Sequence, residues 1–201
     1  GIKMIVFGIT GGSGSGKTSV SKMLEKLGVH IIDTDVIAHE IVEPNSECLN
    51  ELVDYFGDSI LNDDKTLNRK KLASIAFSDK QKTVALSNIT HKYIKAEVVK
   101  DINTTDAELV GIDGAVIIGS NVEPLCEFIV SVIADKQSRI TRIKTRDNIT
   151  DEQAIQRINA QNDDEFYKEN SMYIIYNNGD IAQLESDVVG LFNKIKGNSF
   201  E

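Results

Sequence analysis

The stretch "MIVFGITGGSGSGKTSV", residues 4–20, decides how this chain is expected to fold. Five of its residues are glycines that fall within nine positions: Gly8, Gly11, Gly12, Gly14 and Gly16. Glycine loses more backbone entropy on folding than any other residue, so such a run needs a reason. An apolar segment precedes the glycines, and Lys17 and Thr18 follow them directly. This order is typical of a strand, a phosphate-binding loop and a helix.

Residues 11–18 match the P-loop pattern G-x-x-x-x-G-K-[ST]. Glycines let consecutive backbone N–H groups turn inward without Cβ clashes, and the N-terminus of the next helix adds partial positive charge. Lys17 is expected to reach the outer phosphates, and the Thr18 hydroxyl to bind Mg²⁺. The sequence therefore predicts a nucleoside triphosphate site made of Gly11, Gly12, Ser13, Gly14, Ser15, Gly16, Lys17, Thr18 and Ser19.

Beyond this loop, apolar runs of strand length alternate with longer segments of helical period. The runs are rich in β-branched residues and do not alternate with polar ones, as in parallel strands buried on both faces. The alternation predicts a parallel sheet with helices on both sides. The expected strands are 4–9, 29–32, 109–112, 128–134 and 172–176, and the expected helices between them are 18–27, 136–146, 151–161 and 181–195.

From about residue 36 to residue 105 no strand pattern appears. Instead, "SECLNELVDYFG", "NRKKLASIAF" and "KTVALSNITHKYIKAEVVKDI" place apolar residues at helical spacing, and Gly57 can end the first helix. We therefore expect a helical lobe inserted between the second and third strands.

Composition narrows the class of protein. The chain has 201 residues, 41% of them hydrophobic and 26% charged, which suits one globular domain or one core with an inserted lobe. A net charge of −9 argues against nucleic acid or an anionic membrane as a main partner. No apolar run approaches the roughly 20 residues that span a bilayer. Cys48 and Cys126 match no metal-ligand spacing, which favours reduced thiols in a cytoplasmic protein.

Carboxylates stand at the ends of two expected strands. Asp33 and Asp35 follow the second strand, where open α/β sheets hold their ligands. Either could orient an acceptor hydroxyl and take its proton, or hold Mg²⁺ through water; alternatively, one of them caps the following helix. Asp113 ends the third strand at a position that could bind the metal's water shell, although any junction of a strand and a turn can carry an aspartate.

Positive charge is concentrated in "KQSRITRIKTR", residues 136–146, which has five basic residues and no acidic one. Arg139, Arg142 and Arg146 share one helix face. This segment is either a solvated basic face or a lid whose arginines close over a triphosphate and stabilise the charge of phosphoryl transfer. Thr150 and Gln153 then have the spacing of a capping box that starts the next helix.

Together these motifs resemble the dephospho-CoA kinase family of P-loop kinases, over about residues 4–190. The segments that carry the resemblance are "TGGSGSGKT", "DTDVIAHEIVEP", "LNRKKLASIAF", "THKYIKAE", "RITRIKTRDNITDEQAIQRINAQ" and "YIIYNNGD". The resemblance implies a three-layer α/β fold of the P-loop type with a five-stranded parallel sheet. It divides the chain into a core at about 1–35, 106–135 and 166–201, a helical acceptor lobe at about 36–105 and a helical lid at about 136–165.

The resemblance also implies transfer of the γ-phosphoryl group of ATP to the ribose 3′-hydroxyl of dephospho-CoA, the last step of coenzyme A synthesis, with Mg²⁺ as cofactor. Lys17, Asp35, Arg142 and Arg146 fall on the catalytic positions, and Asp35 is the expected base. Asp33, Asp35, Arg69 and His91 fall on the acceptor side. Arg142 and Asn177 fall near ATP, and Thr18 and Asp113, the latter through water, near the metal.

The chain departs from the usual family pattern on the acceptor side. Ala115 replaces a proline and Gly119 a glutamate after the third strand, and the other departures are His39 for arginine, Asn45 for glycine and Lys92 for proline. These changes keep two alternatives open: a P-loop kinase acting on a nucleoside, nucleotide or sugar acid, and a nucleotide-binding paralogue without transferase activity. Retention of Asp35 and the lid arginines favours a working kinase.

Overall fold

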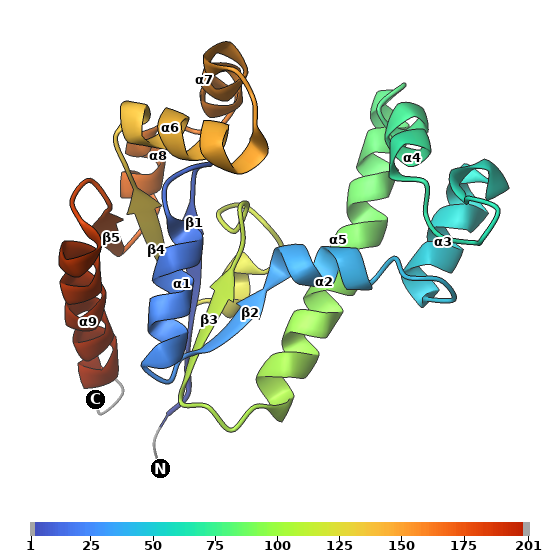
Figure 1. Cartoon of the computed structure of the whole chain (residues 1–201). Coiled ribbons are helices and arrows are strands. Elements are labelled where there is room, and N and C mark those ends of the chain that lie inside the picture. Colours follow the sequence, from blue (N-terminus) through green and yellow to red (C-terminus); the bar gives the residue numbers. More distant parts are fainter. Residues whose placement is uncertain (1–2, 199–201) are drawn as a thin grey trace. The chain divides into compact units, whose positions relative to one another are not determined.

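A parallel five-stranded sheet is the centre of the computed structural model, which describes residues 3–198 (Figure 1). The strands are β1 Ile5–Gly11, β2 His30–Asp33, β3 Leu109–Asp113, β4 Phe128–Ile133 and β5 Tyr173–Tyr176. Their order across the sheet is β2-β3-β1-β4-β5, and every neighbouring pair is parallel. The expected strands are thus confirmed to within about two residues at each end.

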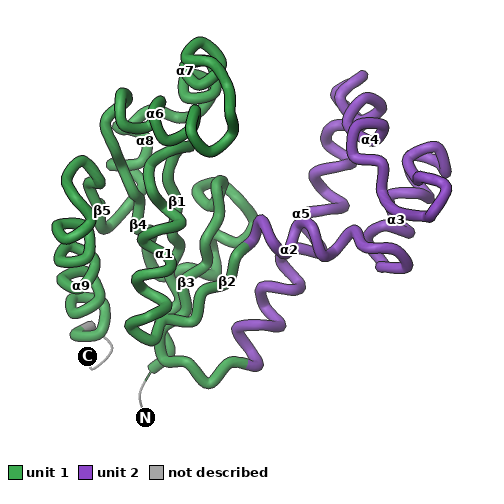
Figure 2. Tube along the Cα trace, viewed as in Figure 1, with its two compact units in different colours: residues 1–33, 105–201 green, residues 34–104 purple. Residues whose placement is uncertain are grey.

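The chain divides into two compact units, coloured separately in Figure 2. The first unit comprises residues 1–33 and 105–201, of which residues 3–33 and 105–198 are described, and the second comprises residues 34–104. The first unit holds the sheet together with α1 Lys17–Lys26, α6 Lys136–Asp147, α7 Asp151–Asn159, α8 Asp164–Glu169 and α9 Ile181–Asn198. The second unit is helical, with α2 Thr34–Glu40, α3 Glu47–Phe56, α4 Arg69–Ala76 and α5 Lys80–Thr104. Two short 3₁₀ turns, Asp58–Ile60 and Glu123–Leu125, complete the elements within residues 3–198.

The main core lies between the sheet and the pair of helices α1 and α9. It combines Phe7 and Ile9 of β1 and Val130 of β4 with Val20 and Leu24 of α1, all fully buried. Helix α9 adds its apolar face, and α8 packs against β4, so that helices cover both faces of the sheet (Figure 1). The sheet is therefore the middle layer of a three-layer α/β fold, as the resemblance implied.

The second unit has a core of its own, in which Leu52 and Ile60 are fully buried. Its helix boundaries follow local signals. The Ser46 hydroxyl accepts a hydrogen bond from the backbone N–H of Leu49 and caps α3, and Gly57, at φ 92°, ends that helix as expected.

Two helices have no counterpart among the helix ranges expected from the sequence. Helix α2 has no buried residue, so its sequence lacks the apolar stripe that periodicity detects. Helix α8 is only six residues long, less than two helical turns. Both segments are short, and neither carries a full helical period of apolar residues, so apolar periodicity does not indicate a helix in either.

Candidate nucleotide and acceptor site

The glycine-rich loop lies at the carboxyl end of β1, between the neighbouring strands β3 and β4. Helix α1 begins at Lys17, and Gly16, in the left-handed region at φ 93°, occupies its N-cap. In the described chain no side chain caps this helix and no acidic residue lies in its first turn. Its first N–H groups and its partial positive charge are therefore available to an anion, as a phosphate site requires.

The loop glycines are also required by the side chains packed behind them. A Cβ atom on Gly12 would lie 2.2 Å from the Arg139 guanidinium, and one on Gly14 would lie 2.6 Å from the Arg139 carbonyl oxygen. A Cβ atom on Gly16 would lie 2.1 Å from the Asn177 amide nitrogen. Three glycines of the run thus admit close approach of other elements, a reason that the sequence pattern alone does not reveal.

Arg142 of α6 and Asn177, just after β5, hold the same loop. The Arg142 guanidinium donates hydrogen bonds to the carbonyl oxygens of Gly14, at 2.9 Å, and Asn177, at 3.1 Å. The Asn177 side chain, which is buried, donates to the carbonyl oxygen of Ser15 at 2.9 Å. Arg142 and Asn177, which the resemblance placed near ATP, therefore contact the loop itself.

Lys17 and Asp113 face each other at the base of the loop. The Lys17 ammonium forms an ion pair with the Asp113 carboxylate, and the Ser21 hydroxyl donates to the other carboxylate oxygen at 2.8 Å. Asp113 is buried and lies opposite Asp33 in the register of β2 and β3. Thr18 is exposed in the first turn of α1. The structure thus gathers Lys17, Asp33, Asp113 and the P-loop at one end of the sheet.

Arg146, near the end of α6, is exposed and pairs with Asp147, whose carboxylate also accepts from Arg157 of α7. These two arginines lower the pKa of Asp147 to about 2 through hydrogen bonds, with their positive charge a smaller contribution. Thr150 and Gln153 form the capping box that their spacing predicted. The basic segment is therefore fastened at its end by an ion-pair cluster.

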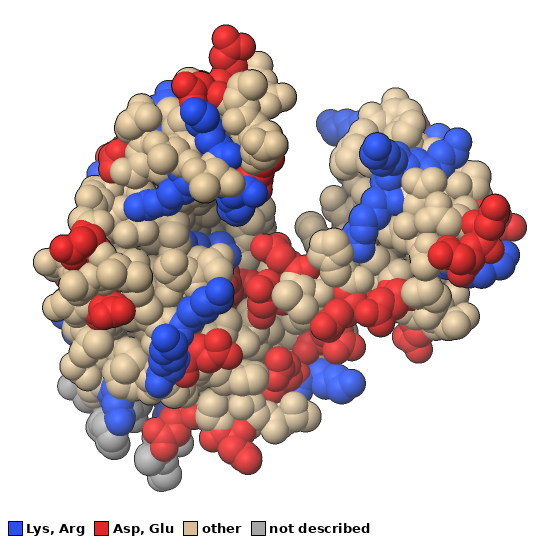
Figure 3. All heavy atoms as spheres, in the orientation of Figure 1, with Lys and Arg blue, Asp and Glu red and all other residues tan. Residues whose placement is uncertain are grey.

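Basic side chains gather over the part of the first unit that carries α6 and α7, with acidic side chains between them (Figure 3). The net charge of the whole chain is −9. Positive charge is therefore locally concentrated on α6, the helix whose Arg139 and Arg142 contact the P-loop.

Three of the four acceptor-side residues, Asp35, Arg69 and His91, lie in the second unit, whereas Asp33 ends β2 in the first unit. Asp35 is exposed in the first turn of α2, and His91 is exposed on α5. The Arg69 guanidinium, at the start of α4, lies 2.9 Å from Nδ1 of His39. Arginine can only donate, so His39 Nδ1 is the acceptor of this bond. Two residues that the resemblance assigned to the acceptor side, Arg69 and the unusual His39, are thus in direct contact.

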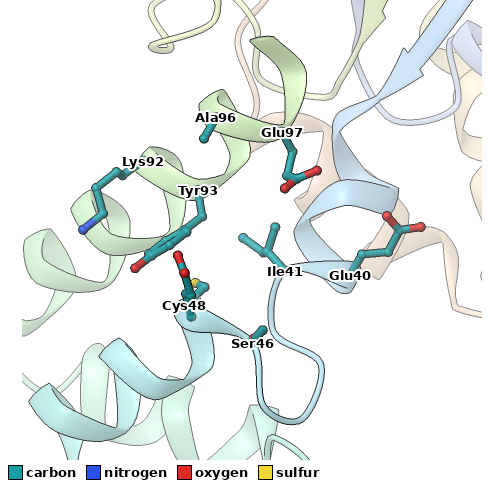
Figure 4. Close-up of a pocket in the computed structure, with 9 residues that line it drawn as sticks. Glu40, Ile41, Ser46, Cys48, Lys92, Tyr93, Ala96 and Glu97 are labelled. Atoms are coloured by element: carbon teal, nitrogen blue, oxygen red, sulfur yellow. The ribbon is translucent and has the colours of Figure 1, made fainter. Parts of the chain in front are cut away.

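A hollow of about 630 Å³ in the second unit was not expected from the sequence (Figure 4). Figure 4 places Glu97 of α5 and Glu40 at the end of α2 on one side of it, and Tyr93 on the other. The hydroxyl of Tyr93 donates to Glu51 at 2.5 Å, and Lys92 pairs with the same carboxylate at 2.7 Å. The carboxylates of Glu40, Glu47 and Glu97 line this hollow and would repel the phosphates of a nucleotide. The hollow is therefore not suited to ATP.

Gln161 was missed as a site residue. It lies between α7 and α8, and its side chain contacts the backbone of Ser13 in the loop. The final glutamine of "RINAQ" was part of the segment that resembled the family, but its partner lies 148 residues away. Spacing within one segment cannot indicate such a contact.

No helix within residues 3–198 combines the length and the apolar character needed to cross a membrane. In the same range, no three or more histidine, cysteine, aspartate or glutamate side chains gather where they could hold a metal ion.

Known proteins with similar sequences include dephospho-CoA kinases. A family model for dephospho-CoA kinase matches residues 5–183. A dephospho-CoA kinase from Lactobacillus johnsonii is 34% identical over 191 residues, which cover 94% of this chain and 96% of that protein. A second, from Listeria monocytogenes, is 34% identical over 194 residues, or 95% of this chain and 97% of that protein.

Solved structures give the same fold. A dephospho-CoA kinase from Campylobacter jejuni superposes with a TM-score of 0.69 at 26% identity, covering 96% of this chain and 98% of that one. A protein from Thermus thermophilus superposes with a TM-score of 0.81 at 23% identity, with the same two coverages. A shikimate kinase from Acinetobacter baumannii superposes with a TM-score of 0.56 at 19% sequence identity and shares the fold.

Proposed function

The chain belongs to the dephospho-CoA kinase family, and from this premise we propose which of its residues carry that family's reaction. The enzyme is an ATP-dependent kinase that phosphorylates dephospho-CoA. The proposed product is CoA, formed by transfer of the γ-phosphoryl group to the ribose 3′-hydroxyl, with ADP released. The observation that carries the proposal is the P-loop at the end of β1, which leads into an uncapped helix N-terminus.

ATP binding is assigned to the loop and its neighbours. The backbone N–H groups from Gly11 to Ser19 surround the phosphates, and Lys17 exchanges Asp113 for the β- and γ-phosphates when the nucleotide binds. Arg142 and Asn177 hold the loop from α6 and the end of β5, next to the nucleotide. These side chains position ATP rather than alter it chemically, because phosphoryl transfer depends chiefly on positioning and charge.

Mg²⁺ suits the oxygen donors that the loop offers. Mg²⁺ commonly binds phosphates together with one or two protein oxygens, and keeps several waters. The Thr18 hydroxyl and, through water, the Asp113 carboxylate are the proposed protein donors; both are hard oxygen ligands at the foot of the loop. When bound, the ion would neutralise charge on the β- and γ-phosphates.

The acceptor is assigned to residues of β2 and the second unit. Asp35 is proposed to take the proton of the 3′-hydroxyl while that oxygen bonds to the γ-phosphorus and the bond from the γ-phosphorus to the bridging oxygen of ADP breaks. Asp33, Arg69 and His91 are proposed to bind the acceptor. The guanidinium of Arg69 suits a phosphate of dephospho-CoA.

The lid arginines are proposed to stabilise the charge of the transferring group. Arg146 is exposed, and its partner Asp147 also has Arg157 as a second partner. Arg146 can therefore leave the cluster without leaving Asp147 unpaired. Arg142 already contacts the loop and needs no such rearrangement.

Product identification tests the function. The purified chain is incubated with ATP, Mg²⁺ and dephospho-CoA, and mass spectrometry is expected to show CoA and ADP in equal amounts. Parallel incubations with a nucleoside, a nucleotide and a sugar acid test the alternative acceptors. Phosphorylation of one of these, but not of dephospho-CoA, would overturn the proposed acceptor; ATP binding without any product would indicate an inactive paralogue.

A further inference from the structure

Two side chains from α6 and the α7–α8 connection hold every polar backbone and side-chain atom of Ser13. The backbone N–H of Ser13 donates to Gln161 Oε1 at 2.9 Å, and Gln161 Nε2 donates to the Ser13 hydroxyl at 3.0 Å. Arg139 Nε donates to the Ser13 carbonyl oxygen at 2.8 Å, and its Nη2 donates to Gln161 Oε1 at 3.1 Å. The tip of the P-loop is thus fixed by a closed network of four hydrogen bonds.

Arg139 is an unusual member of this network because it is buried and charged. Only 7% of the residue is exposed, and within residues 3–198 no carboxylate lies at ion-pair distance from its guanidinium. Burial lowers the pKa of Arg139, and the charge of Asp164 opposes that effect. An arginine nevertheless keeps its proton in proteins, so a positive charge lies directly behind Gly12 and Ser13.

A buried charge with no carboxylate in direct contact is costly in free energy, and the charge of Asp164 offsets only part of that cost for Arg139. A bound anion would offset more of it. A loop whose inner side receives a triphosphate brings such an anion close to Arg139. The Gln161 side chain is neutral. Its Oε1 atom accepts hydrogen bonds from both the Ser13 N–H and Arg139 without neutralising the charge of the arginine, which leaves that charge to act on a bound anion.

We propose that Arg139 and Gln161 are positioning residues for the nucleotide, with Arg139 contributing a fixed positive charge through the loop and Gln161 holding Ser13 in place. The inference rests on the proposed ATP site. Substitution of Arg139 or Gln161 is therefore expected to change the affinity for the nucleotide but not the affinity for the acceptor.

The substitution Gln161→Glu separates this role from a purely structural one. Glutamate has nearly the same shape and keeps an oxygen that accepts from both the Ser13 N–H and Arg139. It loses the Nε2 donor, so the Ser13 hydroxyl must donate to the carboxylate instead of accepting, and its charge neutralises the arginine. Calorimetric titration is expected to show ATP affinity reduced about tenfold or more, because a full charge acts over a short distance at low effective dielectric. The melting temperature should stay the same or rise, and the KM for dephospho-CoA should change less than twofold.

Gln156→Glu is the matched control, since Gln156 is exposed on the neighbouring helix α7 and the substitution changes the net charge equally. It should bind ATP within twofold of the unaltered chain. Arg139→Lys, which keeps the charge, should bind ATP better than Arg139→Met by fivefold or more.

Equal ATP affinity of the Gln161→Glu and Gln156→Glu variants would overturn the inference. So would a Gln161→Glu variant that fails to fold, together with equal affinities of the two Arg139 variants, because the network would then be structural only. If the unaltered chain bound no ATP, the proposed nucleotide site would fail first, and the inference with it.

Discussion

The ammonium group of Lys17 forms an ion pair with the carboxylate of Asp113, across the base of the P-loop. Both side chains are largely buried, and the Ser21 hydroxyl keeps the second carboxylate oxygen occupied at 2.8 Å. The lysine that should bind phosphate is therefore held beside the position that should bind the metal's water. Nucleotide binding is expected to exchange one partner for another rather than to order a disordered side chain.

Replacement of Lys17 by methionine should abolish most activity while the fold persists. The change removes the charge that neutralises the phosphates, and loss of one such group typically costs about 10²–10³-fold in kcat. Lys22→Met, at an exposed position on the same helix, is the control and should keep full activity. Steady-state kinetics of both variants measure the activity, and circular dichroism shows whether the fold persists. Activity of the Lys17 variant within a few-fold of the unaltered chain would contradict the assignment of Lys17 to the phosphate site.

Gly16 and Gly28 provide a matched pair for testing the role of the loop glycines. Both have left-handed backbone, at φ 93° and 106°, so alanine at either position should cost about 1–2 kcal/mol of folding free energy. Only at Gly16 would the new Cβ meet another group, the Asn177 amide at 2.1 Å. Gly16→Ala should therefore also weaken ATP binding tenfold or more, whereas Gly28→Ala should not. Urea denaturation and ATP titration measure the two effects separately, and equal ATP affinities would contradict the assigned role of Asn177.

Alanine substitutions of the two lid arginines, Arg142 and Arg146, are expected to affect stability to different degrees. Arg142→Ala removes hydrogen bonds to Gly14 and Asn177, so it should lower stability by about 1–3 kcal/mol and reduce kcat. Arg146→Ala removes an exposed ion pair, which should leave stability within about 1 kcal/mol while still reducing kcat. Thermal melts and kinetics with dephospho-CoA distinguish them. A higher KM for dephospho-CoA with unchanged kcat would instead place either arginine in the acceptor site.

The two thiols should react slowly at neutral pH. Burial raises the pKa of Cys48 to about 11 and that of Cys126 to about 12, with nearby Glu51 and Glu123 adding to the effect. Because an unfolded thiol has a pKa of about 8.5, the neutral thiols stabilise the fold below that pH, and this contribution is lost as the pH rises toward 11. Disulfide-exchange reagents should therefore label both cysteines rapidly in urea but only slowly in the native chain at pH 7.5. Fast labelling of the native chain would contradict the raised pKa values.

Strands and long helices could be predicted from the sequence because burial on both faces of the sheet and on one face of each helix leaves a periodic pattern. The P-loop was equally evident, since its glycines, lysine and threonine are contiguous. Helix α2 was not, because it has no buried residue to reveal its period. Local signals such as the capping box of Thr150 and Gln153 were predicted for the same reason that the loop was: all their atoms lie within a few residues.

The contacts around the P-loop could not be predicted, because they join residues far apart in the chain. Arg139 meets Ser13 across 126 residues, and Asn177 meets Ser15 across 162. The sequence showed a basic helix face but not which of its members would be buried, and Arg139 is buried while Arg146 is exposed. Which side of a helix faces the protein depends on the packing of the whole unit and not on the helix alone.

The proposed chemistry depends most on Asp35, in the first turn of α2. Asp35→Asn keeps the shape and the hydrogen bonding of the side chain but cannot take the proton of the acceptor hydroxyl. A positioned general base contributes about 10²–10⁴-fold, although positioning matters more in a loose phosphoryl-transfer transition state, so kcat should fall by at least about 10²-fold. ATP affinity should change little, since the nucleotide is assigned to the loop. Asp33→Asn should be milder, or recover as Mg²⁺ is raised if Asp33 holds the metal. Kinetics and ATP titration of both variants across a Mg²⁺ series decide between them: near-normal kcat for Asp35→Asn would leave Asp33 or Asp113 as the base.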